Sequence, residues 1–285
     1  MTSPLTFSFE LFPPRTPEVQ AKLPEVIRQL AAVRPDYFSV TYGAGGSTQE
    51  GTYETILAVI EHAGIEAAPH LTCMGSTRAA VAAQLDRYRA AGVKRVVALR
   101  GDLPATAMSA AAPGEFHYAN ELVSFIRKTH GDHFKIEVAA YPEMHPQASG
   151  PSEDFDNFRR KVEAGADAAL TQLFYNADAY FDFLERCEKA GIRIPIVPGI
   201  MPITGCANAL KFCTGCGADL PRWIRLRLEE LQNDKPALVD FGLGVVTRLC
   251  ATLLRGGAPG LHFYTVNQSG PALQLWKNLA LSVPA

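Results

Sequence analysis

The sequence predicts an α/β fold, a (β/α)8 TIM barrel with extra helices between strands seven and eight. Three observations favour this fold: short strand-like apolar runs alternate with longer amphipathic stretches, eight such runs occur, and the chain has 285 residues. Strands that alternate with helices form parallel βαβ units. Eight units in roughly 250–300 residues match the size of this barrel. We therefore expect residues 1–285 to form a single domain.

The predicted strands are short and apolar, and a helical stretch follows most of them. They are Thr6–Phe12, Asp36–Thr41, Glu66–Leu71, Arg95–Leu99, Lys135–Ala140, Ala168–Leu173, Arg193–Pro198 and Leu261–Val266. Pro13 and Pro14 end the first strand, because proline has no N–H to donate to a sheet.

The segments between the strands mix apolar and charged residues at helical spacing. The predicted helices are Pro17–Val33, Gln49–Ala63, Arg78–Ala91, Ala119–Thr129, Asp154–Ala164 and Ala177–Ala190. Several are followed directly by glycine, which is typical of a helix C-terminus. The long stretch from Thr204 to Gly260 is expected to hold the extra helices.

An open doubly wound sheet is the alternative fold. It usually has fewer strands and a glycine-rich dinucleotide fingerprint after the first one. The glycine-rich loop of this chain, residues 43–48, follows the second strand instead, and Thr48 stands where the fingerprint has its third glycine. The barrel is therefore preferred.

Composition favours a soluble cytoplasmic protein without nucleic-acid or membrane partners. The formal net charge is only −2, whereas nucleic-acid and polybasic membrane proteins are strongly basic. No uninterrupted apolar run is long enough to span a bilayer, and residues 1–4 do not begin a signal peptide. The six cysteines are too sparse for a disulfide framework, and the pair Cys213 and Cys216 lacks the two further ligands that zinc needs. We expect free thiols and no metal.

In a barrel of this kind, the active site is built at the carboxyl ends of the strands. Those ends are unusually polar here, whereas the opposite ends carry no comparable set. In chain order the polar residues at the carboxyl ends are Glu10, Thr41, Tyr42, His70, Arg100, Asp102, Tyr141, Gln172 and Asn267.

Glu10 is the most informative of these residues. Strand alternation places it on one face with Ser8, opposite Phe9 and Leu11. A lone carboxylate in so apolar a strand is costly to bury unless it is paired or used. The segment alone leaves open a structural pair with a nearby arginine or backbone amide, or a functional carboxylate. A place on the functional face of the barrel favours the second interpretation.

Two further groups of charged residues have both a structural and a functional interpretation. Arg100 and Asp102 flank a glycine and form either a local ion pair or a pair directed at a ligand. Asp154, Arg160 and Lys161 lie at helical spacing and form either a solvated face or a phosphate clamp.

Eight segments, found in order at the predicted strand ends, together resemble the methylenetetrahydrofolate reductase family from about residue 7 to 268. They are Ser8–Thr16, Ser39–Ala44, Ala67–Cys73, Ala98–Pro104, Ala139–Glu143, Thr171–Phe174, Pro198–Ile203 and His262–Asn267. The resemblance covers the catalytic barrel alone. It implies a bacterial-type member without the regulatory domain of eukaryotic members, and NADH rather than NADPH as the donor.

The resemblance implies a barrel that binds FAD and reduces 5,10-methylenetetrahydrofolate to 5-methyltetrahydrofolate in a ping-pong reaction. NAD(P)H reduces the flavin and leaves, and the folate then accepts the hydride. On this resemblance, Glu10 is the general acid that protonates the folate N10. Asp102 lies beside the flavin and pterin, where a carboxylate favours the cationic iminium. Gln172 contacts the folate or the nicotinamide.

The resemblance also implies a set of FAD contacts that come from many of the predicted strand ends. They are Thr41, Tyr42, Ala44, His70, Arg100, Gly101, Asp102, Tyr118, Ala119, Tyr141, His145, Ala148, Asp154, Asn157, Arg160 and Lys161. The resemblance therefore favours the phosphate clamp for residues 154–161, because a basic pair there can meet the FAD diphosphate.

Two positions depart from the family pattern, and both are expected to bind folate. Gln268 stands where the family commonly has arginine, and Asn208 where it commonly has glutamine. Losing the arginine removes a cation for the anionic glutamate tail of the substrate. A homologue with weakened folate binding is therefore one alternative function. Another flavin-dependent barrel oxidoreductase, proline-dehydrogenase-like, is a second, and a cofactor-free barrel lyase a third. We also expect a homo-oligomer.

Overall fold

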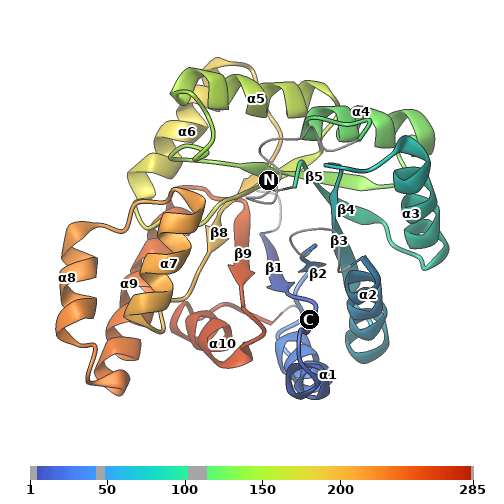
Figure 1. The fold of residues 1–285 in the computed structure, drawn as a ribbon. Coiled ribbons are helices and arrows are strands. Elements are labelled where there is room, and N and C mark those ends of the chain that lie inside the picture. The colour runs from blue at the N-terminus through green and yellow to red at the C-terminus, as the bar shows by residue number, and fades with distance from the viewer. Residues whose placement is uncertain (1–4, 43–48, 102–113, 284–285) are drawn as a thin grey trace.

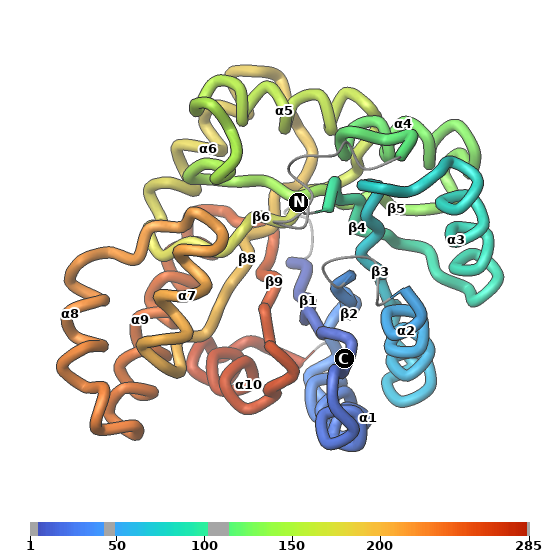
Figure 2. Tube along the Cα trace, viewed as in Figure 1, coloured from blue at the N-terminus to red at the C-terminus, as the bar shows by residue number. Residues whose placement is uncertain are grey.

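Parallel strands surrounded by helices form a barrel, which confirms the predicted fold class (Figure 1). The computed structural model describes residues 5–42, 49–101 and 114–283. In this part of the chain, nine strands pair in the order β7-β6-β5-β4-β3-β2-β1-β9-β8, and every recorded pair is parallel. The first and last strands of the chain, β1 and β9, lie side by side (Figure 2).

Each predicted strand is present, with ends that differ by at most two residues except at the seventh. The strands are β1 Thr6–Leu11, β2 Tyr37–Val40, β3 Glu66–Thr72, β4 Arg95–Leu99, β5 Lys135–Ala140, β6 Ala168–Thr171, β7 Ile196–Val197, β8 Gly199–Ile200 and β9 Gly260–Tyr264.

The seventh predicted strand is split, which corrects the expected range Arg193–Pro198. It begins only at Ile196, is interrupted at Pro198, and continues to Ile200. Proline has no N–H for the sheet, and the interruption lets the two halves pair with different neighbours. The first half pairs with β6 and the second with β9, so this one segment joins both ends of the sheet.

Gly199 is required at this junction because two neighbours leave no room for a side chain. A Cβ there would lie 2.3 Å from Thr171 O and 2.5 Å from the hydroxyl of Tyr264. The Gly199 N–H donates to Thr171 Oγ1 at 2.9 Å, and Tyr264 donates to Thr171 O at 2.6 Å. These bonds link β6 to β9 across the split strand.

The predicted helices and the extra helices before the last strand are both confirmed. The helices are α1 Pro17–Ala31, α2 Gln49–Ala63, α3 Arg78–Ala90, α4 Ala119–His130, α5 Pro151–Glu163, α6 Ala177–Lys189, α7 Cys206–Cys216, α8 Arg222–Glu230, α9 Lys235–Arg255 and α10 Ser269–Asn278. Helix α5 starts three residues before the predicted Asp154, with Pro151 in its first turn, a position where proline is well tolerated. Helix α10, after the last strand, was not among the predicted helices.

Alternation along β1 divides its side chains between two cores, as the sequence predicts. Phe9 and Leu11 face the helices, where Phe9 lies 5.5 Å from Phe263 and 6.1 Å from Trp276 of α10, measured between ring centroids. Ser8 and Glu10 are buried on the other face, toward the barrel interior. A smaller apolar cluster fills part of that interior, formed by Tyr37, Ala68, Val97, Leu170 and Val197.

Helix α9 is the one helix of the described ranges that is long and apolar enough to cross a membrane by length and composition. An 18-residue window of it has a mean hydropathy of 1.7, and 44% of that window is buried inside the protein. The helix packs against α6 and α10, and Val246, Cys250 and Leu253 are fully buried. These contacts are those of a core helix.

Candidate active site

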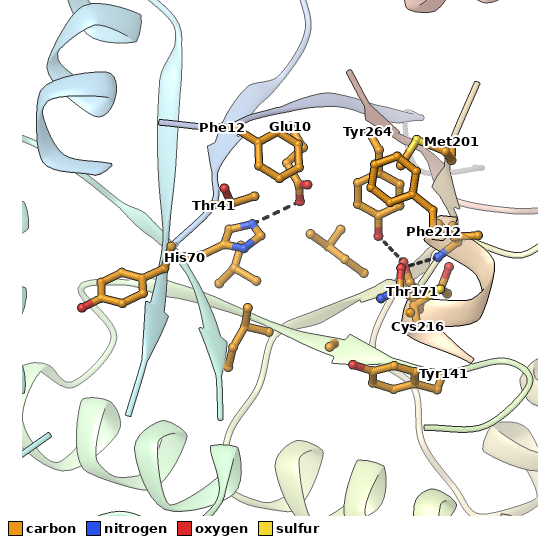
Figure 3. Close-up of a pocket in the computed structure, with 18 of the residues that line it drawn as sticks. Glu10, Phe12, Thr41, His70, Tyr141, Thr171, Met201, Phe212, Cys216 and Tyr264 are labelled. Carbon is orange, nitrogen blue, oxygen red and sulfur yellow. Dashed lines mark hydrogen bonds and ion pairs between the residues drawn. The ribbon is translucent and has the colours of Figure 1, made fainter. Parts of the chain in front are cut away.

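A cavity of about 570 Å³ lies at the carboxyl ends of the strands (Figure 3). It brings together predicted site residues that are far apart in the sequence. Those that line it are Glu10, Thr41, Tyr42, His70, Tyr141 and Gln172. Strand-end position alone therefore located six of the 21 residues that line this cavity.

Glu10 lies between two histidines, and its side chain is 8% exposed. Its Oε2 atom is 3.4 Å from Nε2 of His70 on β3 and 3.6 Å from Nε2 of His262 on β9. In the described part of the chain, the groups recorded near this carboxylate are these histidines, and not the arginine or backbone amide considered from the sequence. Figure 3 shows Glu10 and His70 pointing toward one another on one side of the cavity.

His70 is held in its neutral form by burial. Removal from water lowers its pKa from 6.5 to about 4, with Glu10 opposing the shift and His262 adding to it. Within residues 5–42, 49–101 and 114–283, its buried Nε2 has no hydrogen-bond partner, since the 3.4 Å contact with Glu10 does not have hydrogen-bond geometry. A buried nitrogen of this kind is unusual in a native protein and points to a ligand.

Tyr264 and helix α7 form the other side of the cavity. Phe212 and Cys216 of α7 lie near Tyr264 and Thr171 (Figure 3). Burial raises the pKa of the Tyr264 hydroxyl well above its usual value, with a further contribution from Glu10. Tyr264 is therefore a neutral hydrogen-bond donor, and its proton is already directed at Thr171 O.

Beside the cavity, two basic side chains approach one another at the start of the loop after β4 and on α5. Lys161 is half-buried and donates to Ala139 O at 2.6 Å. Burial lowers its pKa from 10.5 to about 8; Asp154 opposes this and Arg100 reinforces it. Asp154 also accepts from the backbone N–H of His145 at 3.1 Å. Of the predicted clamp residues, Asp154 therefore acts on the charge of Lys161, and Arg100 joins them from the end of β4. Arg160 is exposed and bonds to Asn157 instead.

The loop after β5 folds over this basic group. Arg100 donates to the side chain of Gln147, and Gln147 N donates to His145 Nδ1 at 3.0 Å. The rings of Tyr141 and His145 meet edge to face, with centroids 4.6 Å apart. Ala148 N donates to His145 O at 2.9 Å, which closes a turn.

The remaining predicted cofactor residues are less closely tied to the cavity. Cys73 Sγ lies 3.7 Å from both Arg100 O and Tyr118 O, so the N-terminus of α4, with Ala119, reaches the end of β4. Gly101 has φ +88°, which favours glycine. Asn157 accepts from Arg160 at 2.8 Å on the exposed side of α5. Ala44 and Asp102 lie outside the described residues.

Two of the three predicted folate residues line a second, smaller hollow of about 50 Å³. Asn208 of α7 and Gln268 before α10 border it, and it shares Met201, Phe212 and Tyr264 with the main cavity. Gln172 lines the main cavity, and its Oε1 accepts from the N–H of Leu173 at 2.8 Å.

Asn267 has a structural role that its strand-end position did not reveal. Its side chain accepts from Phe12 N and donates to Phe12 O, both at 2.8 Å. With φ +54° it holds the turn after β9 against the end of β1. It is therefore removed from the candidate site.

Known proteins resemble this chain over most of its length. A family profile described as methylenetetrahydrofolate reductase matches residues 2–280. The chain belongs to this family. The 5,10-methylenetetrahydrofolate reductase of Salmonella typhimurium is 38% identical over 268 residues, which cover 93% of this chain and 87% of the relative. That of Escherichia coli K12 is 37% identical with the same coverage.

Two more distant comparisons extend this result. Methylenetetrahydrofolate reductase (NADH) 1 of Zea mays is 36% identical over 285 residues, covering 96% of this chain and 48% of the relative. A solved structure of an uncharacterized protein from Clostridium thermocellum, which binds two copies of 5-methyl-5,6,7,8-tetrahydrofolic acid, has a TM-score of 0.63 and 16% identity. The match covers 98% of this chain and 94% of that structure's chain. At that identity the likeness shows the fold alone.

Reasoning from the sequence missed two residues that line the cavity, Tyr264 and Lys211, and one buried behind it, His262. His262 and Tyr264 belong to a segment that carried the family resemblance, but neither was assigned to the site. Their period-two spacing in β9, opposite Ser8 and Glu10 of β1, is the signal that could have found them. Lys211 is a cation at the cavity edge that only the packing of α7 reveals.

Proposed function

We propose that this chain reduces 5,10-methylenetetrahydrofolate to 5-methyltetrahydrofolate, with NADH as the donor and FAD as the cofactor. Membership of the family supports the substrate and the reaction. The observation that carries the residue assignment is the buried position of Glu10 between two histidines in the main cavity. FAD, when bound, accepts a hydride from NADH and passes it to the folate in a second half-reaction.

The residues beside the cavity fit FAD by the chemistry of their donors. Lys161 has three N–H donors, and among the described residues one acceptor is recorded for them, Ala139 O. With Arg100 nearby, it offers two cations to a diphosphate. His70 Nε2 lies beside Glu10 and has no hydrogen-bond partner among the described residues, which suits a polar atom of the cofactor. We assign these residues to FAD, and we keep Ala44 and Asp102 as proposed contacts from the resemblance.

Glu10 acts as the general acid on the folate in this proposal. Its proton moves to N10 of the substrate, and the bond between N10 and the methylene carbon breaks. That carbon then becomes an iminium with N5, ready to accept hydride. The neighbouring histidines keep Glu10 in place and exclude water from it. Gln172, which lines the same cavity, is assigned to contact with the folate or the nicotinamide.

Arg15 and Lys211 replace the cation that Gln268 lacks. Both are exposed, both line the cavity, and no ion pair is recorded for either in the described part of the chain. Cations at the mouth of a cavity attract an anionic substrate and hold it by Coulomb attraction. We therefore assign the glutamate tail of the folate to this edge of the cavity. In this proposal the chain binds folate normally, and the alternative of weakened folate binding is not preferred.

The test separates the two half-reactions by flavin absorbance. Glu10→Gln is expected to reduce its flavin with NADH within threefold of the wild-type rate. The rate at which methylenetetrahydrofolate reoxidises it should fall by at least 100-fold, the range in which general acids contribute. Equal loss of both half-reactions would count against Glu10 as the acid.

The same protein preparation decides between this proposal and its alternatives. If the purified protein takes up no FAD, the reductase assignment is contradicted and the cofactor-free lyase is supported. A protein that is reduced by NADH but never reoxidised by methylenetetrahydrofolate, while proline reduces it, is a proline-dehydrogenase-like enzyme. The homo-oligomer stays a prediction, which light scattering of the same preparation measures.

A further inference from the structure

Helix α8 carries an exposed apolar pair at the outer edge of the molecule (Figure 1). Trp223 is 56% exposed and Leu226 is 42% exposed, whereas the other tryptophan of the chain, Trp276, is buried. The two exposed side chains are three residues apart, so they lie on one face of the helix. The opposite face packs inward through Ile224 and Leu228, which are fully buried. The described part of the chain therefore leaves an apolar stripe of α8 open to solvent.

The ring of Trp223 is held in place although it is exposed. It meets the ring of Phe241 of α9 edge to face, with centroids 6.1 Å apart. A side chain that is already ordered loses little conformational freedom when a partner covers it. Tryptophan and arginine are enriched at the centres of protein interfaces, and α8 has one tryptophan and three arginines among its nine residues. This composition is typical of an interface.

The charges of α8 are ordered against the helix dipole. Its first turn has two cations, Arg222 and Arg225, and no acidic residue, whereas Glu229 and Glu230 end the helix. The N-terminus of a helix is its positive end, so both placements are unfavourable. The N and O atoms of the pair Arg225–Glu229 are 3.8 Å apart, and this pair has its cation first, which is the weaker order. Local rules are broken mostly at functional sites, which points to a partner that offsets these charges.

A second α8, lying antiparallel to the first, has the complementary order of charges. Leu226 is the centre of the exposed stripe, and Arg222 and Glu230 lie four residues before and after it. A two-fold contact pairs residue i with residue j and residue j with residue i. A two-fold axis beside Leu226 therefore places Arg222 of each copy against Glu230 of the other, and Trp223 against Leu226 of the partner subunit.

We propose that α8 is the centre of a two-fold interface between two copies of this chain, in which Arg222 of each copy pairs with Glu230 of the other. The ion pairs recorded within α8 are Arg225–Glu229 and Arg227–Glu230, and neither uses Arg222. The Arg227–Glu230 pair is exposed on both sides, so it contributes little, and Glu230 can accept from a second cation.

The two signs of charge favour a second copy over other occupants. An anionic membrane or a nucleic acid would suit the arginine end of α8 but would be repelled by Glu229 and Glu230. A partner for the whole stripe needs an apolar centre with an anion at one end and a cation at the other. The antiparallel copy of α8 supplies all three.

The proposed interface extends beyond α8 into a neighbouring hollow of about 500 Å³. This hollow lies between α8, α9 and α10, and Phe241, which Trp223 contacts, lines it. Gly244 also lines it, and a Cβ there would meet Arg248 Nη1 at an ordinary 3.6 Å, so packing among the described residues does not require glycine. A stable interface covers about 800 Å² of each partner, and a nine-residue helix of about 14 Å is too short to supply that area alone. The hollow provides the further surface.

The first measurement is sedimentation velocity of the purified protein over a range of concentrations. The wild-type chain is expected to associate through this interface. Arg222→Glu and Glu230→Arg each place like charges together twice across the axis, so each should raise the dissociation constant by about 10–100-fold. Arg222→Glu also puts a carboxylate in the first turn, which favours the helix, and an unchanged far-UV circular dichroism spectrum checks that α8 is folded.

Mixing the two single variants is the decisive step. In a mixed dimer the introduced glutamate meets the introduced arginine, and native Glu230 of one copy meets native Arg222 of the other. Association should return to within about fivefold of the wild-type dissociation constant, the scale of one exposed ion pair. Within one chain, positions 222 and 230 are about 12 Å apart along the helix, so this rescue arises only between copies.

The apolar centre is tested by Leu226→Ser, which removes two leucine side chains at the axis and should raise the dissociation constant at least about tenfold. Leu57→Ser on α2 is the matched control, because Leu57 is 40% exposed and lies on another helix. It should leave association unchanged.

The outcomes that overturn the inference are distinct from those that test the proposed reaction. A wild-type chain that stays monomeric, or an assembly that neither charge reversal weakens, leaves α8 to another partner and overturns the inference. A mixture of the two variants that fails to regain association overturns it too, as does an equal effect of Leu57→Ser. None of these measurements uses NADH or folate, so the proposed function stands or fails separately.

Discussion

Replacement of Lys161 by methionine is expected to stabilise the FAD-free protein and to weaken FAD binding. The side chain is half-buried, and burial of its charge destabilises the folded protein, because burial lowers the pKa of Lys161 from 10.5 to about 8. One pKa unit corresponds to about 1.4 kcal/mol, so the full shift amounts to about 3 kcal/mol. Partial solvent contact and the loss of the hydrogen bond to Ala139 O both reduce this stabilisation. We expect the free energy of unfolding to rise by about 1–2 kcal/mol in the variant.

The pH dependence of this gain has a definite sign. Above pH 10.5 the lysine is neutral in both the folded and the unfolded chain, so burial costs nothing. Below the folded pKa of about 8 the charged form must be buried, and the full cost applies. The unfolded chain binds the extra proton between these values, so wild-type stability rises with pH there. The advantage of Lys161→Met should be full at pH 7 and vanish above pH 10.5.

Two assays of the same variant test this reasoning. Thermal unfolding of FAD-free protein at pH 7 should show Tm raised by about 2–5 °C. Titration with FAD should show a Kd raised by about 10–100-fold, the loss of one charge-assisted hydrogen bond. Lys128→Met on the exposed face of α4 is the control and should change neither. A variant that is less stable without FAD, or that binds FAD normally, refutes the assignment of Lys161 to the diphosphate.

Two further predictions concern the main cavity. His70 has its pKa lowered from 6.5 to about 4 by burial, so the unfolded chain binds more protons in that window and stability falls as the pH drops from 6.5 to 4. His70→Gln should remove up to about 3 kcal/mol of this loss. The measurement is denaturant unfolding of FAD-free protein at several pH values. If the free energy of unfolding changes with pH as steeply in the variant as in the wild type, the buried neutral histidine is contradicted. The double variant Arg15→Gln, Lys211→Gln should raise the Kd for methylenetetrahydrofolate about 2–10-fold at low salt. The difference should disappear with a folate that lacks the glutamate tail; if it persists, the two cations do not hold that tail.

The barrel and most strand ends were predictable because local pattern decides them. Eight apolar runs with helices between them require parallel pairing, and their carboxyl ends gather in one place. The split of the seventh strand was not predictable, since Pro198 can end a strand or interrupt it, and the choice depends on Thr171 and Tyr264 from distant segments. Helix α10 was hidden by Gly270 and Pro271, yet β1 needs its Trp276 to cover Phe9.

The partners of Glu10 could not be read from local sequence for the same reason. His70 and His262 lie 60 and 252 residues away along the chain, and only strand register brings them to Glu10. His262 lies within the segment His262–Asn267 that carries the family resemblance, but its place beside Glu10 follows from the pairing of β9 with β1. The spacing of residues within one segment does not show how that strand is aligned with a strand distant in the sequence.

The hydrogen bonds of the barrel interior explain why the one buried polar side-chain atom without a partner among the described residues, Nε2 of His70, is informative about the site. Such interiors are usually filled by branched apolar side chains, whereas here β1, β2, β5 and β9 contribute Ser8, Tyr37, Glu137 and His262. Buried polar groups are costly unless each is hydrogen-bonded. Here Arg95 and Tyr37 both donate to Glu137, and Ser8 is hydrogen-bonded to His262. Within the described residues, the buried side-chain nitrogen or oxygen left without a partner is Nε2 of His70, at the cavity end. This nitrogen lies beside Glu10, and in the proposed function it is the atom that contacts the cofactor in the cavity.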